Sequence, residues 1–385
     1  MLSPDRLRQG SGESRRSEAK AETLKQAQHV MTVCNACRYC EAYCPVFQAM
    51  ENRTAFAKGD VMYLANLCHN CGECLYACQY APPHEFGINV PLVLAEARLE
   101  SYEEYCWPSF MSGAFRRSGI VLSLALAAAS MAFLWPFVQP SDARADFYAV
   151  IPHDVMVGIF GVVALYVAVA LGMGLKRATA AFGTPVASGT FVASGFSRTD
   201  RPPEGGRYLA TIRDTLTLRH LHAAGDDCSS EIETRTPWRR YFHHCTFYGF
   251  ALCFASTTVA AIYHIVFGWR APYAYASLPV VLGTIGGVGL LIGPVGLLFE
   301  RDRRDPDLRD ATQSGLDVSF IVMLFMTSLT GLLLLAWRQQ ASMPLLLVIH
   351  LGFVLGLFLT LPYGKFVHGI YRTAALLKFS TEAPR

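Results

Sequence analysis

Six long apolar segments make up about half of the chain from Ile120 onward, and five of them contain no Asp, Glu, Lys or Arg. A helix rises about 1.5 Å per residue, so about 20 apolar residues cross a hydrocarbon core of roughly 30 Å. One such segment could be a buried helix of a soluble protein, but six together indicate a membrane bundle. The expected spans are residues 120–137, 155–175, 245–267, 278–299, 318–337 and 344–366.

The composition agrees with a membrane location. Hydrophobic residues make up 52% of the chain and charged residues 16%, whereas soluble domains carry about 25% charged residues. These values exclude a wholly soluble, disordered or collagenous protein. The net charge of +3 is too small to attract a polyanion, so we expect membrane lipid and no nucleic acid as a partner.

The change of composition along the chain divides it into three regions. Residues 1–28 mix charges of both signs without an apolar run, so we expect a disordered N-terminus that is neither a signal peptide nor an anchor. Residues 29–107 hold nine of the twelve cysteines, and residues 108–385 hold the six spans. A linker at 176–242 contains a flexible small-residue stretch and a helix-like run at 211–222. The expected fold is all-α, with a helical cysteine-rich domain before a six-helix transmembrane bundle.

The distribution of basic residues predicts the orientation of the spans. With the amino end inside, the outer loops hold only Arg144, Arg270 and Arg338, while the inner side holds twenty Lys and Arg, or ten without the linker. Positively charged loops stay in the cytoplasm. We therefore expect a multi-pass protein of the bacterial inner membrane, with both termini and the cysteine-rich domain on the cytoplasmic side.

Two cysteine runs carry the clearest chemistry, because each has the spacing C-x2-C-x2-C-x3-C. This is the bacterial pattern for 4Fe–4S clusters, in which the fourth cysteine of each run ligates the other cluster. The pattern assigns the first cluster to Cys34, Cys37, Cys40 and Cys78. It assigns the second cluster to Cys68, Cys71, Cys74 and Cys44. Pro45 follows the first run, and Gln79 takes the corresponding place after the second.

Zinc is the main alternative for these cysteines, because paired C-x2-C units also form tetrahedral zinc sites. Two complete four-cysteine runs favour iron–sulfur clusters, and a reducing cytoplasm disfavours disulfides. The remaining cysteines lack this spacing and are expected to be structural thiols; they are Cys106, Cys228, Cys245 and Cys253.

Histidines near the ends of the third and sixth spans are candidate ligands of b haems, since ionisable groups in lipid are costly and usually functional. His350 and His368 are 18 positions apart and share one face if a single helix carries both. A b haem of this kind takes two axial imidazoles from different helices. We expect His264 to pair with His350 near the outside and His243 with His368 near the cytoplasm, with alternates His244 and His153. The alternative is that these histidines satisfy local hydrogen bonds.

Other features give weaker signals. The glycine-rich stretch at 283–296 permits close approach of a helix or a flat cofactor, and ordinary helix packing is favoured. A metal site in the linker is not expected from His220, His222 and Cys228. Possible contacts for quinone or haem propionates are Lys365, Arg240 and Tyr363, with interfacial snorkelling favoured for the two basic residues.

The chain resembles the tricarballylate/citrate-utilisation protein B family in both cysteine runs and in three further motifs. These motifs are WRRYFHHCTFYGF at 238–250, TSLTGLLLLAW at 327–337 and LPYGKFVHGIYR at 361–372. The segment between the cysteine runs looks helical and resembles the α-helical ferredoxin modules of respiratory iron–sulfur subunits. The C-terminal part with His350 and His368 also resembles the gamma subunit of respiratory nitrate reductase, whose last helix carries haem-bearing histidines at this spacing.

The family resemblance implies an electron-transfer protein. Electrons would pass from an FAD-dependent tricarballylate- or citrate-type dehydrogenase through two 4Fe–4S clusters and one or two b haems to quinone. Two other functions stay open: an iron–sulfur redox sensor in the membrane, and a substrate carrier with accessory clusters. The absence of charged residues in the first five spans argues against the carrier.

Overall fold

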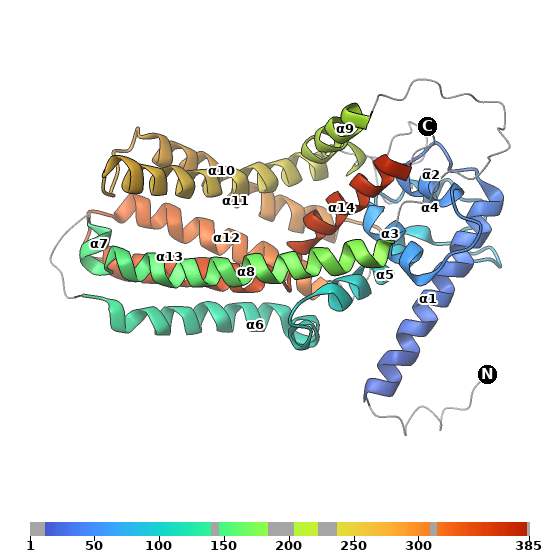
Figure 1. The fold of residues 1–385 in the computed structure, drawn as a ribbon, viewed down its shortest axis with the longest axis horizontal. Coiled ribbons are helices and arrows are strands. Elements are labelled where there is room, and N and C mark those ends of the chain that lie inside the picture. The colour runs from blue at the N-terminus through green and yellow to red at the C-terminus, as the bar shows by residue number, and fades with distance from the viewer. Residues whose placement is uncertain (1–11, 140–145, 184–203, 222–236, 309–313, 383–385) are drawn as a thin grey trace.

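The computed structural model describes residues 12–139, 146–183, 204–221, 237–308 and 314–382. Every regular element within these ranges is a helix, which confirms the all-α prediction. Figure 1 shows an N-terminal group of helices at one end of a bundle of long helices that lie roughly side by side. Both described chain ends lie at the end of the molecule that carries the N-terminal group (Figure 1).

Five helices form the N-terminal domain: α1 Gly12–Cys37, α2 Pro45–Glu51, α3 Lys58–Leu67, α4 Glu73–Tyr76 and α5 Val90–Tyr105. The prediction of disorder over residues 1–28 is wrong for residues 12–28, because α1 begins at Gly12. Its later turns bury Ala27 against the domain core. Its earlier turns are tied to α5 by ion pairs from Arg16 and Lys20 to the buried carboxylate of Glu103.

Six helices are long and apolar enough to cross a membrane, as the sequence predicts. Apolar side chains on their outer surface stay exposed, among them Val162 at 71% and Ile265 at 75%. Such exposure suits a lipid environment. The six helices are α6 Phe110–Leu134, α8 His153–Phe182, α10 Trp238–Phe267, α11 Leu278–Asp302, α12 Ser314–Trp337 and α13 Met343–Thr360.

The remaining helical elements of the described residues lie between and after these six helices. They are η2 Trp135–Phe137, α7 Phe147–Val150, α9 Glu204–Leu216, η3 Arg219–Leu221, η4 Pro306–Leu308 and α14 Val367–Glu382. The helix-like run that the sequence predicts at 211–222 is helical at 211–216, the end of α9, and at 219–221, which form η3.

The sixth span is shorter than predicted, because α13 ends at Thr360 and residues 361–366 form turns before α14. Pro362 explains the break, since proline lacks a backbone N–H and clashes with the preceding helical turn. His350 and His368 therefore lie on two different helices. The expectation that one helix carries both histidines on one face is wrong.

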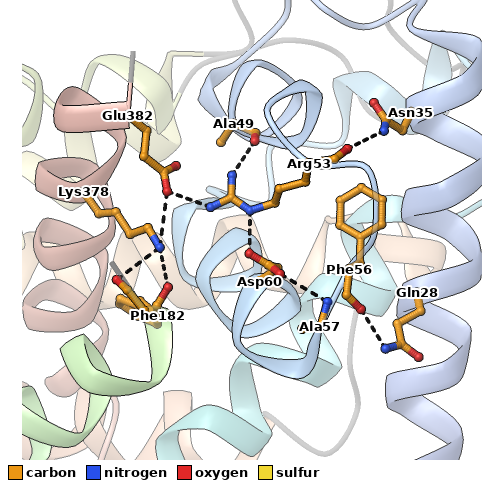
Figure 2. Close-up of polar contacts among 11 residues, drawn as sticks. Gln28, Asn35, Ala49, Arg53, Phe56, Ala57, Asp60, Phe182, Lys378 and Glu382 are labelled. Carbon is orange, nitrogen blue, oxygen red and sulfur yellow. Dashed lines mark hydrogen bonds and ion pairs between the residues drawn. The ribbon is translucent and has the colours of Figure 1, made fainter. Parts of the chain in front are cut away.

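The N-terminal domain and the bundle share one hydrophobic core. Tyr63 of α3 packs against Phe182 at the end of α8, with ring centroids 5.9 Å apart. Tyr105 of α5 packs against Tyr371 of α14 at 5.6 Å. A polar network around Arg53, which lies between α2 and α3, joins the N-terminal domain to α14 (Figure 2). Arg53 donates to the Ala49 carbonyl of α2, to Asp60 of α3 and to Glu382 of α14. These contacts fix the N-terminal domain against the bundle.

Candidate functional site

The first cysteine run lies where α1 passes into α2. Cys34 and Cys37 occupy the last turn of α1, and Cys44 precedes Pro45 at the start of α2. Arg38 adopts a left-handed backbone with φ of 56° directly after α1, which turns the chain toward the remaining cysteines. The backbone N–H groups of Val46 and Phe47 face the Cys44 thiol.

The second cysteine run wraps around the end of α3 and the short helix α4. Cys68 follows the last residue of α3, and Cys74 lies within α4. Gly72 has a φ of +93°, a conformation that suits glycine, and an added Cβ there would lie 2.7 Å from Leu308. The close approach of Leu308 shows that η4 covers this run.

The structure brings the eight cysteines together in the two groups that the motif predicts. Burial raises the pKa of Cys34 to about 12, and the neighbouring thiols that raise it further are Cys78, Cys40 and Cys37. Burial likewise raises the pKa of Cys44, with additional contributions from the thiols of Cys71 and Cys68. The fourth cysteine of each run is thus a neighbour of the other run.

The environment of the two groups suits iron–sulfur clusters. Buried neutral thiols are unfavourable to deprotonate, but a coordinated metal deprotonates them. The first group lines a cavity of about 220 Å³, far larger than the space of one water molecule. Within the described ranges, no three His, Cys, Asp or Glu side chains lie close enough to hold a single metal ion. A four-iron cluster is larger than one ion and takes ligands that stand further apart.

Backbone N–H groups surround the cysteine sulfurs. Asn70 donates to the Cys68 sulfur at 3.3 Å, and the N–H groups of Tyr80 and Ala81 face Cys78. Hydrogen bonds to sulfur are among the features that set the potential of an iron–sulfur cluster.

Four arginines from different parts of the chain hold the backbone of the second run. Arg98 and Arg372 both donate to the Cys68 carbonyl, each at 2.8 Å. Arg239 donates to the Asn70 carbonyl at 3.1 Å, and Arg304 donates to the same oxygen. Burial and the charge of Arg98 lower the pKa of Arg372 to about 10, so its guanidinium remains charged at neutral pH.

His243 and His368 face each other beside these arginines. Their ring centroids lie 6.1 Å apart at an interplanar angle of 76°. Nδ1 of His368 contacts the carbonyl of Lys365. The structure therefore brings the expected inner pair together, while His244 contacts the Thr217 carbonyl at 3.2 Å.

The outer histidines are arranged differently from the expectation. His264 stacks on His153 with ring centroids 3.9 Å apart. His350 instead contacts Thr330 of α12, with its Nδ1 3.2 Å from the hydroxyl oxygen. The ring partner of His264 is thus the alternate His153, and His350 packs beside Gly331, where an added Cβ would lie 2.9 Å from its ring.

The weaker signals have varied outcomes. His222 and Cys228 lie outside the described residues, and His220 contacts Asp214 at 3.5 Å. Lys365 forms an ion pair with Asp317 at 2.8 Å, and Arg240 binds the Thr217 carbonyl. Tyr363 shares a hydrogen bond with Tyr166.

The remaining cysteines and the glycine-rich stretch pack within the protein. Cys106 is buried, and Cys253 lies against Gly286 of α11. The glycines of α11 bring that helix against α10, where an added Cβ on Gly293 would lie 2.4 Å from Thr246. The stretch at 283–296 therefore serves helix packing.

The four arginines are site residues that sequence reasoning missed. Arg239 and His243 are four residues apart on α10, and His368 and Arg372 are four apart on α14. Residues at this spacing share a helix face. The spacing could have indicated the arrangement, but the common target of the two arginines depends on the tertiary fold.

Comparison with known proteins identifies both parts of the chain. The family model "Citrate utilization protein B Fer4-like domain" matches residues 27–104, and "Citrate utilization protein B" matches residues 116–385. A protein of Escherichia coli named citrate utilization protein B is 46% identical over 380 residues, which cover 96% of this chain and 95% of that protein. No solved structure matches. The Fer4-like domain and its cysteines indicate iron–sulfur clusters, the six apolar helices indicate a multi-pass membrane protein, and the chain belongs to the citrate utilization protein B family.

Proposed function

We propose that this protein accepts electrons from an FAD-dependent dehydrogenase of a citrate-like tricarboxylate or dicarboxylate and delivers them to membrane quinone. The observation that carries the proposal is a repeated Arg–His pair. Helices α10 and α14 each place an arginine on the second cysteine run and a histidine four residues nearer the bundle, which is about 6 Å of helix rise. The cysteine domain and the inner histidines therefore form one continuous site.

Two 4Fe–4S clusters, when bound, supply one-electron acceptors that divide the two-electron oxidation of a flavin. The protein supplies eight thiolates, held by the ends of α1 and α3 and by α4. Cys37 of the first group is exposed, whereas Cys68 of the second group is buried. The first group is thus the side that an external donor can approach, and the second group faces the membrane helices.

Haem b, when bound, supplies a one-electron carrier within the bilayer. His243 and His368 would hold this group, because imidazole nitrogens are haem ligands and the two rings face each other from different helices, with their centroids 6.1 Å apart. The Lys365 carbonyl orients the His368 ring through Nδ1, as backbone carbonyls do for metal-bound histidines, and leaves Nε2 for the metal.

An outer haem has two candidate ligand sets. One is His264 with His153, which already stack. The other is the expected pair His264 with His350. Thr330 supports His350 as a ligand, because its hydroxyl donates to the Met326 carbonyl at 2.7 Å and therefore accepts from Nδ1 of His350. That arrangement leaves Nε2 of His350 free for a metal.

The proposed location is the bacterial inner membrane with the cysteine domain in the cytoplasm. The bundle end that carries this domain also carries Arg239, Arg304 and Lys365, which agrees with the positive-inside rule. The proposed quinone contacts at this end are Lys365 with Asp317, and Tyr363 with Tyr166.

The proposal is tested with anaerobically purified protein by optical spectra before and after dithionite, together with iron and haem quantification. His243→Ala and His368→Ala should each remove the same b-type haem signal and leave the clusters intact. His244→Ala is the matched control and should keep that signal, because His244 binds the Thr217 carbonyl. Unchanged haem content in both test variants would reject the inner ligand pair.

Reduction of quinone in proteoliposomes by a reduced flavoprotein donor tests the electron path as a whole. Cys71→Ser should abolish this reduction. Two results together would favour the redox sensor. The unmodified protein would reduce no quinone, and loss of the clusters in a variant would change the binding of a partner protein. Uptake of citrate or tricarballylate by the same proteoliposomes would favour the carrier.

A further inference from the structure

We infer that four arginines hold the cluster of Cys68, Cys71, Cys74 and Cys44 at a higher reduction potential than the cluster of Cys34, Cys37, Cys40 and Cys78. This inference rests on the proposed function, because it concerns the clusters that the cysteines would bind. It adds a direction to the proposed electron path: an electron that enters at the exposed first cluster is transferred to the second cluster, which lies nearer the membrane helices.

The first step of the argument is the number and placement of the cations. Arg98 of α5, Arg239 of α10, Arg304 after α11 and Arg372 of α14 all donate to backbone carbonyls of residues 68–70. Cys68 is itself a proposed ligand, and the charges of Arg239 and Arg372 act on the thiols of Cys71 and Cys68. An arginine is charged at any physiological pH.

The second step is the balance of charge. Among the described residues, two carboxylates act on this run: Glu73, which affects Cys71, and Asp305, which accepts a hydrogen bond from Tyr76 at 3.2 Å. Within the described part of the chain, four arginines therefore contact the backbone of this run against these two carboxylates. A reduced cluster with thiolate ligands carries one more negative charge than the oxidised cluster, so an excess of cations favours reduction.

The third step is the contrast with the first group. Arg38 is the arginine that lies within that run, and its Nε donates to the Asn35 carbonyl at 3.1 Å in an exposed position. Glu41 is exposed in the same loop. Water screens charges at such a surface, so these side chains change the potential of the first cluster little.

Burial alone would act in the opposite direction, since a desolvated anion resists a further negative charge. The same low dielectric strengthens the attraction of each fixed arginine. Arg98 is 3% exposed, so its interaction with the cluster is weakly screened. The attraction of the arginines therefore outweighs the effect of burial on the reduction potential of the second cluster.

The test is a potentiometric titration followed by electron paramagnetic resonance on the full-length protein in detergent. Cys37→Ser and Cys71→Ser assign the two signals, because each removes a ligand of one cluster. In the unmodified protein, the signal lost in Cys71→Ser should have the higher midpoint potential. Arg304→Gln should lower that potential and leave the other unchanged.

Arg38→Gln is the matched control and should leave the second potential unchanged. Arg304→Lys keeps the charge and should restore most of the shift, which separates a charge effect from local unfolding. Equal or reversed potentials in the unmodified protein, or an unshifted second signal in Arg304→Gln, would overturn the inference. A protein with the expected order of potentials but no quinone reduction would overturn the proposed function alone, and a protein without iron would overturn both.

Discussion

Arg53 donates from Nη2 to Oε1 of Glu382 at 2.8 Å, although 329 residues separate them in the chain. Both side chains are at most 2% exposed. Asp60 accepts from Nε of Arg53 at 2.6 Å, and Lys378 lies 3.3 Å from Glu382 (Figure 2). The C-terminal helix is thereby joined to the domain that carries the cysteines, and the same helix carries His368 and Arg372.

Removal of one partner of this buried pair should destabilise the protein strongly. Glu382→Ala leaves the Arg53 charge buried beside Asp60 alone, and such changes cost about 3–5 kcal/mol. The melting temperature in detergent should fall accordingly. Glu104→Ala is the control, because its ion pair with Lys58 is exposed on both sides, and exposed pairs contribute about 0–1 kcal/mol. Equal effects of the two substitutions would contradict this role of Glu382.

Glu103 should make the attachment of α1 sensitive to acid. Burial opposes its ionisation, but hydrogen bonds from Arg116, Arg16 and Lys20 prevail and hold its pKa below the ordinary value of 4.5. A carboxylate whose pKa is lower in the folded state stabilises the fold above pH 4.5, and this contribution is lost as the pH falls through the folded-state pKa.

The measurement for Glu103 is the melting temperature of the unmodified protein and of Glu103→Gln between pH 3 and pH 7, a range set around the ordinary carboxyl pKa of about 4. The variant should melt at a lower temperature near neutral pH, and the difference should shrink at acidic pH. A difference that stays constant with pH would show that Glu103 acts through packing and not through its charge.

Gly249 should be intolerant of any side chain. An added Cβ would lie 2.9 Å from the Gly286 carbonyl and 3.1 Å from the Leu290 nitrogen, and these backbone atoms cannot move without shifting α11. We expect Gly249→Ala to cost about 1–3 kcal/mol and to disturb the site at the start of α10. Gly161→Ala is the control, since its added Cβ meets no atom of the described chain within 4 Å apart from its own helix backbone and neighbours. Equal stability of both variants would contradict close packing of α10 on α11.

The helix α9 should lie in the membrane interface. Its exposed apolar side chains include Leu209 and Ile212, and Leu216 accepts a hydrogen bond from Tyr248 at 2.9 Å through its carbonyl. A nitroxide label at Leu209 in nanodiscs should be relaxed by lipid-soluble oxygen more than a label at Arg219. The reverse order would place this face of α9 in water.

The transmembrane helices could be predicted from the sequence because lipid imposes a simple rule on length and charge. The ends of these helices beside the N-terminal domain could not be predicted, since α8 and α10 extend through polar residues that pack on that domain. The start of α1 was missed for a related reason. Its residues are charged, and Arg16 and Lys20 become ordered by pairing with the distant Glu103.

The cysteine grouping could be predicted because a local spacing encodes it. The histidine pairs depend on how helices meet. His243 faces His368 as expected although a helix break precedes His368, and His264 meets His153 from α8. The four arginines come from four separate elements, so only the folded chain shows that they converge on residues 68–70.

Iron and acid-labile sulfide content of the anaerobically purified full-length protein tests the central claim most directly. The account predicts about eight irons and about eight sulfides per chain, with a loss of about half of each in Cys71→Ser. Zinc in place of iron, without sulfide, would contradict the assignment of the two cysteine groups and the electron path built on it.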